Sequence, residues 1–69
     1  MEEIIAQRIQ ELRKEKRLSQ EEFAKICNVK QSCVSKWERG TTFPSLETVV
    51  FICHTFKVSS DYLLGLSEY

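Results

Sequence analysis

The sequence has few residues that interrupt helices and few that bind metal ions. One proline and two glycines occur in 69 residues, so we expect a folded, largely helical chain without low-complexity segments. The three cysteines form no Cys-x-x-Cys pair, and the single histidine has no ligand-type neighbour. This pattern excludes a zinc module, and we expect neither a metal nor a cofactor. No nucleophile–base pair or phosphate loop can be assembled either, which argues against an enzyme.

Net charge and long apolar runs are also absent. Ten basic residues balance ten acidic ones, which gives a formal net charge of +0. Proteins that bind polyanions without specificity are usually basic overall, so neutrality argues against that class. No apolar run approaches the roughly 18 residues that a membrane helix needs, and the acidic N-terminus does not resemble a signal peptide. We expect one domain, residues 1–69, that is cytoplasmic and binds no membrane.

The three cysteines are expected to have structural roles. Cys27 and Cys53 fall on apolar stripes and are most simply small core residues, because free cysteine is usually buried. Cys33 lies near the start of a predicted helix, where redox sensing is the alternative to a structural role. No resolving partner is evident from the sequence, which disfavours that alternative.

What the sequence does contain is a pair of helix signals within residues 19–38. Ser19 is followed three positions later by Glu22, which is the spacing of a capping box at a helix start. Asn28 stands where this helix should end, because asparagine tolerates the left-handed conformation better than most residues. These signals predict a helix over residues 20–27.

A second helix is predicted over residues 31–38. Val34 and Trp37 lie three positions apart on its apolar face. In the preceding helix, Ala24 has the small side chain that lets two helices cross closely. Two helices that cross steeply over a turn of three or four residues form a helix-turn-helix.

Helical periodicity continues on both sides of this pair. We predict helices over residues 2–16 and 45–56, and a last helix that Ser59 begins and Gly65 ends. Phe51 and His54 are expected to point away from the core. The residues expected to face the core are Ile5, Ile9, Leu12, Phe23, Ile26, Cys27, Val34, Trp37, Phe43, Leu46, Val49, Val50, Ile52, Cys53, Phe56, Tyr62, Leu63 and Leu66.

Three segments, SQEEFA, SKWERG and DYLLG, together resemble the XRE (Cro/cI-like) regulators found in phage repressors and small bacterial regulators. The resemblance covers residues 4–66. It implies an all-α, five-helix lambda-repressor-like domain with its helix-turn-helix at helices 2 and 3. It also implies an ion pair between Arg13 and Glu38. The chain departs from the family at Arg17, where Gly or Asn is common, so we expect a strained or differently shaped turn there.

The second helix of a helix-turn-helix enters the DNA major groove, and its N-terminal residues reach base edges. This selects Gln31, Ser32 and Lys36 as base contacts, and the resemblance implies the same three positions. Gln20 is expected to contact a phosphate and to brace Gln31. The alternative for each residue is an ordinary solvated side chain. The full set of expected phosphate contacts is Gln20, Lys30, Ser35, Arg39, Thr41 and Thr42.

The expected function is sequence-specific binding of double-stranded DNA by a bacterial or phage-type repressor. A domain of this size covers half a site, so we expect a homodimer on a palindromic operator with half-sites about one DNA turn apart. The second hypothesis is a protein-interaction module of antitoxin type with an unknown protein partner. An RNA-binding role is disfavoured because no aromatic stacking platform is apparent. The expected dimer interface is Val58, Leu63, Leu66, Phe51 and Tyr69.

Overall fold

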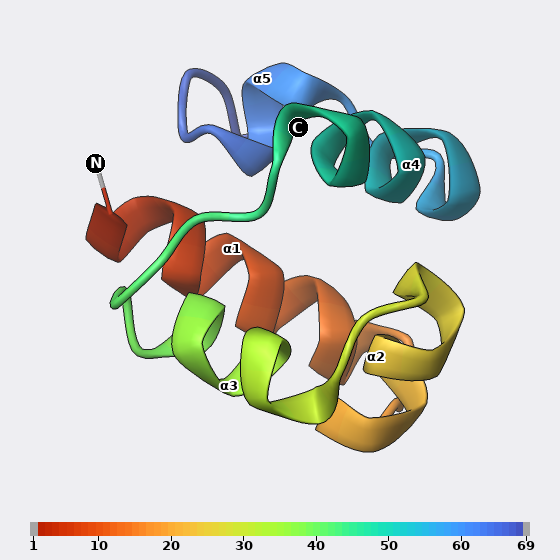
Figure 1. Ribbon diagram of the computed structural model, residues 1–69. Helices are drawn as coiled ribbons and strands as arrows, with labels where there is room; N and C mark the ends of the chain where they lie inside the picture. Colours follow the sequence, from red (N-terminus) through yellow and green to blue (C-terminus); the bar gives the residue numbers. More distant parts are fainter. Residues whose placement is uncertain (1, 69) are drawn as a thin grey trace.

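The computed structural model describes residues 2–68, which form five helices and no strand. In Figure 1, α1 crosses the middle of the domain, with α3 on one side of it and α4 and α5 on the other. The all-α, five-helix prediction is therefore confirmed, and the predicted ends of the first four helices are within one residue of those observed. No helix in this range is long and apolar enough to span a membrane. The helices are α1 Glu2–Glu15, α2 Gln20–Cys27, α3 Gln31–Glu38, α4 Leu46–Phe56 and α5 Ser60–Leu63.

The start and end of α2 follow the local sequence signals. The Ser19 hydroxyl accepts a hydrogen bond from the Glu22 backbone N–H at 3.0 Å, and the Glu22 carboxylate accepts one from the Ser19 N–H at 2.8 Å. This capping box satisfies backbone donors that a helix start leaves unpaired. The bond from the Ser19 N–H to the carboxylate is the main cause that lowers the pKa of Glu22. Asn28 ends the helix in the left-handed conformation, with φ of 58°.

The core gathers one face of each helix around α1. Ile9, Phe23, Val34, Ile52 and Leu63 each expose 0% of their surface, and they come from five different helices. The rings of Phe23 and Phe56 stack with centroids 5.3 Å apart, which ties α2 to α4. Ala24 is buried where α2 packs on α3, as its small side chain predicts.

Part of the predicted core is wrong. Pro44 is buried where Phe43 was expected, and Phe43 is 49% exposed. The apolar face of α4 is also narrower than predicted, because this helix packs mainly against α2 and α5. Its inward residues are Val49, Ile52, Cys53 and Phe56. The residues predicted in the core but found exposed are Ile26, Phe43, Leu46, Val50 and Leu66.

Besides Asn28, two residues with a Cβ atom adopt the left-handed conformation after a helix. Arg17, after α1, has φ of 58°, and Lys57, after α4, has φ of 57°. Backbone bonds close both helix ends: the Leu18 N–H donates to Arg13 O and the Val58 N–H to Cys53 O, each at 3.1 Å. A Cβ atom makes this conformation unfavourable by roughly 1 kcal/mol. The strain expected at Arg17 is thus present.

Candidate nucleic-acid interface

The predicted base-contacting residues share the outer side of α3. Gln31, Ser32 and Lys36 are exposed, while Val34 and Trp37 on the opposite side are buried. α3 therefore uses one face for the core and presents short polar and basic side chains on the other. This is the composition that base edges and phosphates require.

The predicted phosphate contacts surround this face. Lys30, Arg39, Thr41 and Thr42 are exposed, and Ser35 is half-buried. Lys30 occupies the N-cap of α3, where its ammonium group makes no cap bond because it can only donate hydrogen bonds and a helix start needs an acceptor.

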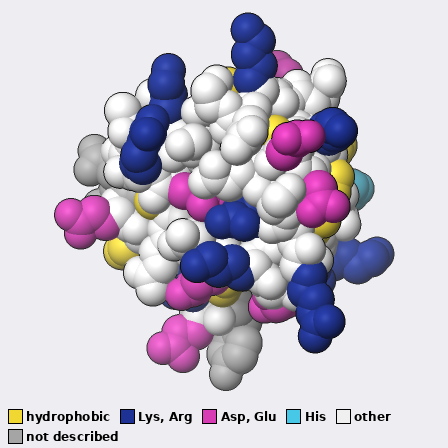
Figure 2. Space-filling view, turned by 90° about the horizontal axis from the view of Figure 1, so that it is seen from below, with side chains coloured by type: hydrophobic (Ala, Val, Ile, Leu, Met, Phe, Trp, Pro, Cys, Tyr) yellow, Lys and Arg dark blue, Asp and Glu magenta, His cyan; other side chains and the backbone are white. Residues whose placement is uncertain are grey.

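Charge on this side of the molecule is mixed rather than uniformly basic. Figure 2 views the domain from the side on which α3 lies in Figure 1, and shows Lys and Arg spaced among polar side chains with several acidic groups between them. Among residues 30–42 the basic side chains are those of Lys30, Lys36 and Arg39, and the acidic one is Glu38. The Glu38 side chain is only 4% exposed and faces inward. Its charge is therefore withdrawn from the surface, which leaves the exposed part of α3 basic.

The Glu38 carboxylate is paired within a partly buried hydrogen-bond network. Its Oε2 lies 2.6 Å from Arg13 Nε, and its Oε1 accepts a bond from Arg13 Nη2 at 3.0 Å. Arg13 Nη1 also donates to the Leu18 carbonyl at 2.9 Å. The hydrogen bond to Glu38 raises the pKa of Arg13, while partial burial opposes that shift. The expected pair of Arg13 and Glu38 is thus present, bidentate, and joins α1 to the end of α3.

Gln20 takes a place in this network that the sequence reading missed. Its Nε2 donates to Glu38 Oε1 at 3.1 Å, so it braces Glu38 rather than the predicted partner Gln31. The bond uses one of the two N–H groups of the amide, so a phosphate contact by Gln20 stays a prediction. The resemblance supplied only the pair of Arg13 and Glu38. The sequence feature that could have indicated Gln20 as the third member of this network is its position at the start of α2, because α2 packs on α3.

The predicted dimer residues differ in their exposure. Leu63 exposes 0% of its surface and belongs to the core, so its assignment to an interface is wrong. Leu66 and Phe51 are 72% and 43% exposed, and Val58 is half-buried. Tyr69 lies outside the described residues.

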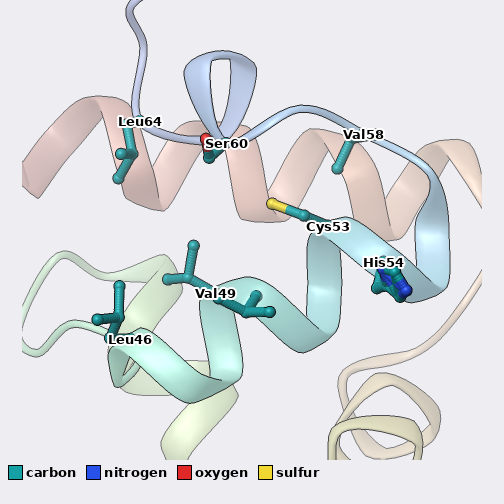
Figure 3. A pocket seen from close by; sticks show the side chains of 8 residues that line it. Leu46, Val49, Cys53, His54, Val58, Ser60 and Leu64 are labelled. Atoms are coloured by element: carbon teal, nitrogen blue, oxygen red, sulfur yellow. The ribbon is translucent and has the colours of Figure 1, made fainter.

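A further apolar surface lies between α4 and α5. A groove of ≈ 520 Å³ runs there, with Val49 and Cys53 on one wall and Val58 and Leu64 on the other (Figure 3). Leu46 forms its open edge and is 80% exposed. Sequence reasoning missed the groove because it counted Leu46 as a core residue.

The described residues contain no group of three or more His, Cys, Asp or Glu side chains that could hold a metal ion. Burial raises the pKa of the Cys27 thiol to about 11 and also raises the pKa of Cys53. Both thiols are therefore protonated at neutral pH, which suits their expected structural role.

Comparison with known proteins places this geometry in a family. The helix-turn-helix family model matches residues 9–63. The chain is 37% identical over 62 residues to the HTH-type transcriptional activator BcrR of Enterococcus faecalis, covering 90% of this chain and 30% of that protein. It is equally identical, 37% over 62 residues, to the antitoxin PezA of Streptococcus pneumoniae, covering 90% of this chain and 39% of PezA.

A phage protein is also similar. The repressor protein C2 of Salmonella phage P22 is 31% identical over 62 residues, which are 90% of this chain and 29% of C2. The chain thus spans about a third of the length of these three curated relatives. Because the family match takes in all of α2 and α3 and most of the remaining helices, the chain belongs to the XRE-type helix-turn-helix family of transcriptional regulators, which are not enzymes.

Proposed function

We propose that this domain binds double-stranded DNA sequence-specifically, with α3 in the major groove. The observation that carries the proposal is the outer face of α3, where Gln31, Ser32 and Lys36 are exposed together above a buried Val34 and Trp37. An α-helix with this division fits the major groove, in which each base pair presents a distinct pattern of donors and acceptors. The network around Glu38 supports the proposal because it fixes α3 against α1 and α2.

Each side chain on this face has a role that its chemistry allows. The Gln31 amide can pair with adenine N6 and N7, Lys36 can donate to guanine O6 or N7, and Ser32 can bond to several bases. Phosphate contacts position the helix and do not read sequence. The residues proposed for them are Gln20, Lys30, Ser35, Arg39, Thr41 and Thr42.

We further propose that the protein acts in the cytoplasm as a homodimer on a palindromic operator, and that its action is repression. A dimer doubles the contacts of one small domain and fixes two half-sites about one DNA turn apart. Occupancy of an operator is enough for repression, because it excludes other proteins from the same grooves. One relative is named a repressor and another an activator, so the direction of regulation needs its own test.

The test is selection of bound duplexes from a randomised DNA pool at near-physiological salt. We expect enrichment of a palindrome, and Gln31→Ala or Lys36→Ala should each weaken binding to it by about 1–3 kcal/mol. Thr55→Ala, an exposed position on α4, serves as the matched control and should bind like the wild type. A folded protein that enriches no sequence would contradict the proposal.

The second candidate is a protein-interaction module. A specific observation favours it: Phe51 is 43% exposed beside a hollow of ≈ 330 Å³ between α2 and α4, in a chain with no net charge. The named antitoxin among the relatives points the same way. If the folded protein enriches no DNA sequence in the selection, the protein-interaction module becomes the better supported function.

A further inference from the structure

The end of α1 and the turn after it carry three cations that the proposed DNA contacts leave unused. Lys14, Lys16 and Arg17 are all exposed. The ion pairs formed among the described residues involve none of these three side chains. Free cations beside a nucleic-acid interface attract phosphate groups, because their binding releases the counterions that surround DNA.

One acidic residue, Glu15, lies among these cations in the sequence. Glu15 lines a small hollow together with Lys57 and Val58, which follow α4. In Figure 1, α4 and α5 lie on the opposite side of α1 from α3. The acidic charge of this segment is therefore on the side of the molecule away from α3.

Hydrogen bonds attach the turn to the helix that is proposed to enter the major groove. Arg13 Nη1 donates to the Leu18 carbonyl at 2.9 Å, and Nε of the same side chain lies 2.6 Å from Glu38 Oε2 at the end of α3. Gln20 also donates to Glu38, at 3.1 Å. Arg17 therefore lies in the chain between two residues that contact the end of α3, and it directly precedes the bonded Leu18.

The turn also lies close to a proposed phosphate contact. In Figure 1, α2 begins at the same lower edge of the domain as α3, and Figure 2, seen from below, shows Lys and Arg side chains out to the rim of that side. Gln20, the first residue of α2, is proposed to contact a phosphate. Arg17 is three residues before it, and three residues span at most about 11 Å. The long side chain of Arg17 can therefore reach the DNA backbone beside Gln20.

The backbone conformation of Arg17 is a second observation that points to a function. Its φ is 58°, a conformation that glycine adopts freely and that a Cβ atom makes unfavourable. Residues held in such conformations cluster at active sites and ligand-binding sites. Within the described residues, the exposed Arg17 side chain forms no ion pair that would stabilise the fold. A ligand contact explains the arginine better than the stability of the fold does.

We infer that Arg17 binds a phosphate of the DNA backbone beside the phosphate contacted by Gln20, and that Lys14 and Lys16 add to the positive field along the same edge. The inference rests on the proposed DNA binding by α3 and extends its footprint to the end of α1. It adds one phosphate per half-site to those that Lys30 and Arg39 neutralise.

The first experiment measures the affinity of the wild type and of Arg17→Gly for the selected operator over a salt series. Arg17→Gly should bind more weakly, and its slope of log K against log salt should be shallower by about 0.9 for each half-site, because one phosphate fewer is neutralised. The loss should be the same on operator and unrelated DNA, since phosphate contacts do not read sequence. Arg17→Lys keeps the charge and should keep the slope.

Lys57→Gly is the matched control. Lys57 is an exposed cation that also follows a helix in the left-handed conformation, with φ of 57°, and a backbone bond of the same kind closes its turn. Each glycine variant therefore removes one cation and relieves the same strain, and urea denaturation should show both to be at least as stable as the wild type. Only Arg17→Gly should weaken DNA binding, because Lys57 lies on the α4–α5 side of the molecule.

A neutral methylphosphonate, placed at one backbone position of the operator at a time, locates the contact. At one position in each half-site it should weaken binding of the wild type but not of Arg17→Gly. Equal slopes for the wild type and Arg17→Gly, or an equal loss from Lys57→Gly, would overturn the inference and leave DNA binding by α3 intact. A wild type that binds no DNA at any salt concentration would overturn the proposed function, and the role of Arg17 with it.

Discussion

Arg17 ends α1 in a conformation that is unfavourable for any residue with a Cβ atom. Its φ is 58°, and its side chain is exposed. Arg17→Gly should therefore stabilise the fold by about 0.5–1 kcal/mol, because relief of strain exceeds the extra entropy of the unfolded glycine chain. Urea denaturation measures the change. Arg17→Ala keeps the Cβ and should bring no gain, and equal effects of the two substitutions would show that strain is not the cause.

Cys27 makes stability depend on alkaline pH. Burial raises its pKa from 9.0 to about 11, so the folded state keeps the proton over a range in which the unfolded state loses it. The corresponding stability is fully present below pH 9 and is lost as pH rises to about 11, a loss of about 2 kcal/mol. The measurement is the free energy of unfolding of wild type and Cys27→Ala across this range under reducing conditions.

The difference between these two proteins isolates the thiol, because all other titrating groups are shared. Cys27→Ala should be less stable than the wild type at pH 8, and this gap should close or reverse by pH 11. A gap that stays constant with pH would contradict the assignment.

At the scale of elements, the bidentate pair of Arg13 and Glu38 holds α1 against α3. The two side chains are 13% and 4% exposed, so removing one charge leaves the other poorly solvated. Glu38→Gln should cost about 2–3 kcal/mol of stability, less than a fully buried pair would. The control is Glu21→Gln, whose 3.8 Å pair with Lys25 is largely exposed and should contribute little.

The same substitution should weaken DNA binding under conditions in which the variant is still folded, because α3 loses its attachment to α1. Titration of a selected operator with folded Glu38→Gln measures this effect. Unchanged stability together with unchanged DNA binding would rule out a structural role for the pair.

The helix ends could be predicted from the sequence because their causes are local. Ser19, Glu22 and Asn28 determine the ends of α2 through bonds to neighbouring backbone, and the structure contains them as predicted. Which residues of α4 face inward depends instead on the helices that pack against it, and the periodicity of the sequence does not reveal those helices. Gln20 donates to Glu38, eighteen positions away, and only the packing of α2 on α3 reveals that contact.

At the scale of the whole molecule, the unusual property is a DNA-binding domain with no net charge. Binding strength must then come from a few placed cations rather than from a general positive field. The proposed phosphate-contacting cations are Lys30 and Arg39, and both are exposed. Two neutralised phosphates per half-site predict a slope of about −1.8 for log K against log salt, or about −4 for a dimer.

Filter binding or fluorescence anisotropy over a salt series measures this slope. Lys30→Ala should make the dimer slope shallower by about 2, one unit per half-site, and should weaken binding to all sequences alike. Gln31→Ala should leave the slope unchanged and instead relax the preference at one base pair, because it removes a base contact. A slope much steeper than about −4 would mean that cations outside α3 also reach the DNA, and that the balanced charge of the chain conceals a wider basic surface.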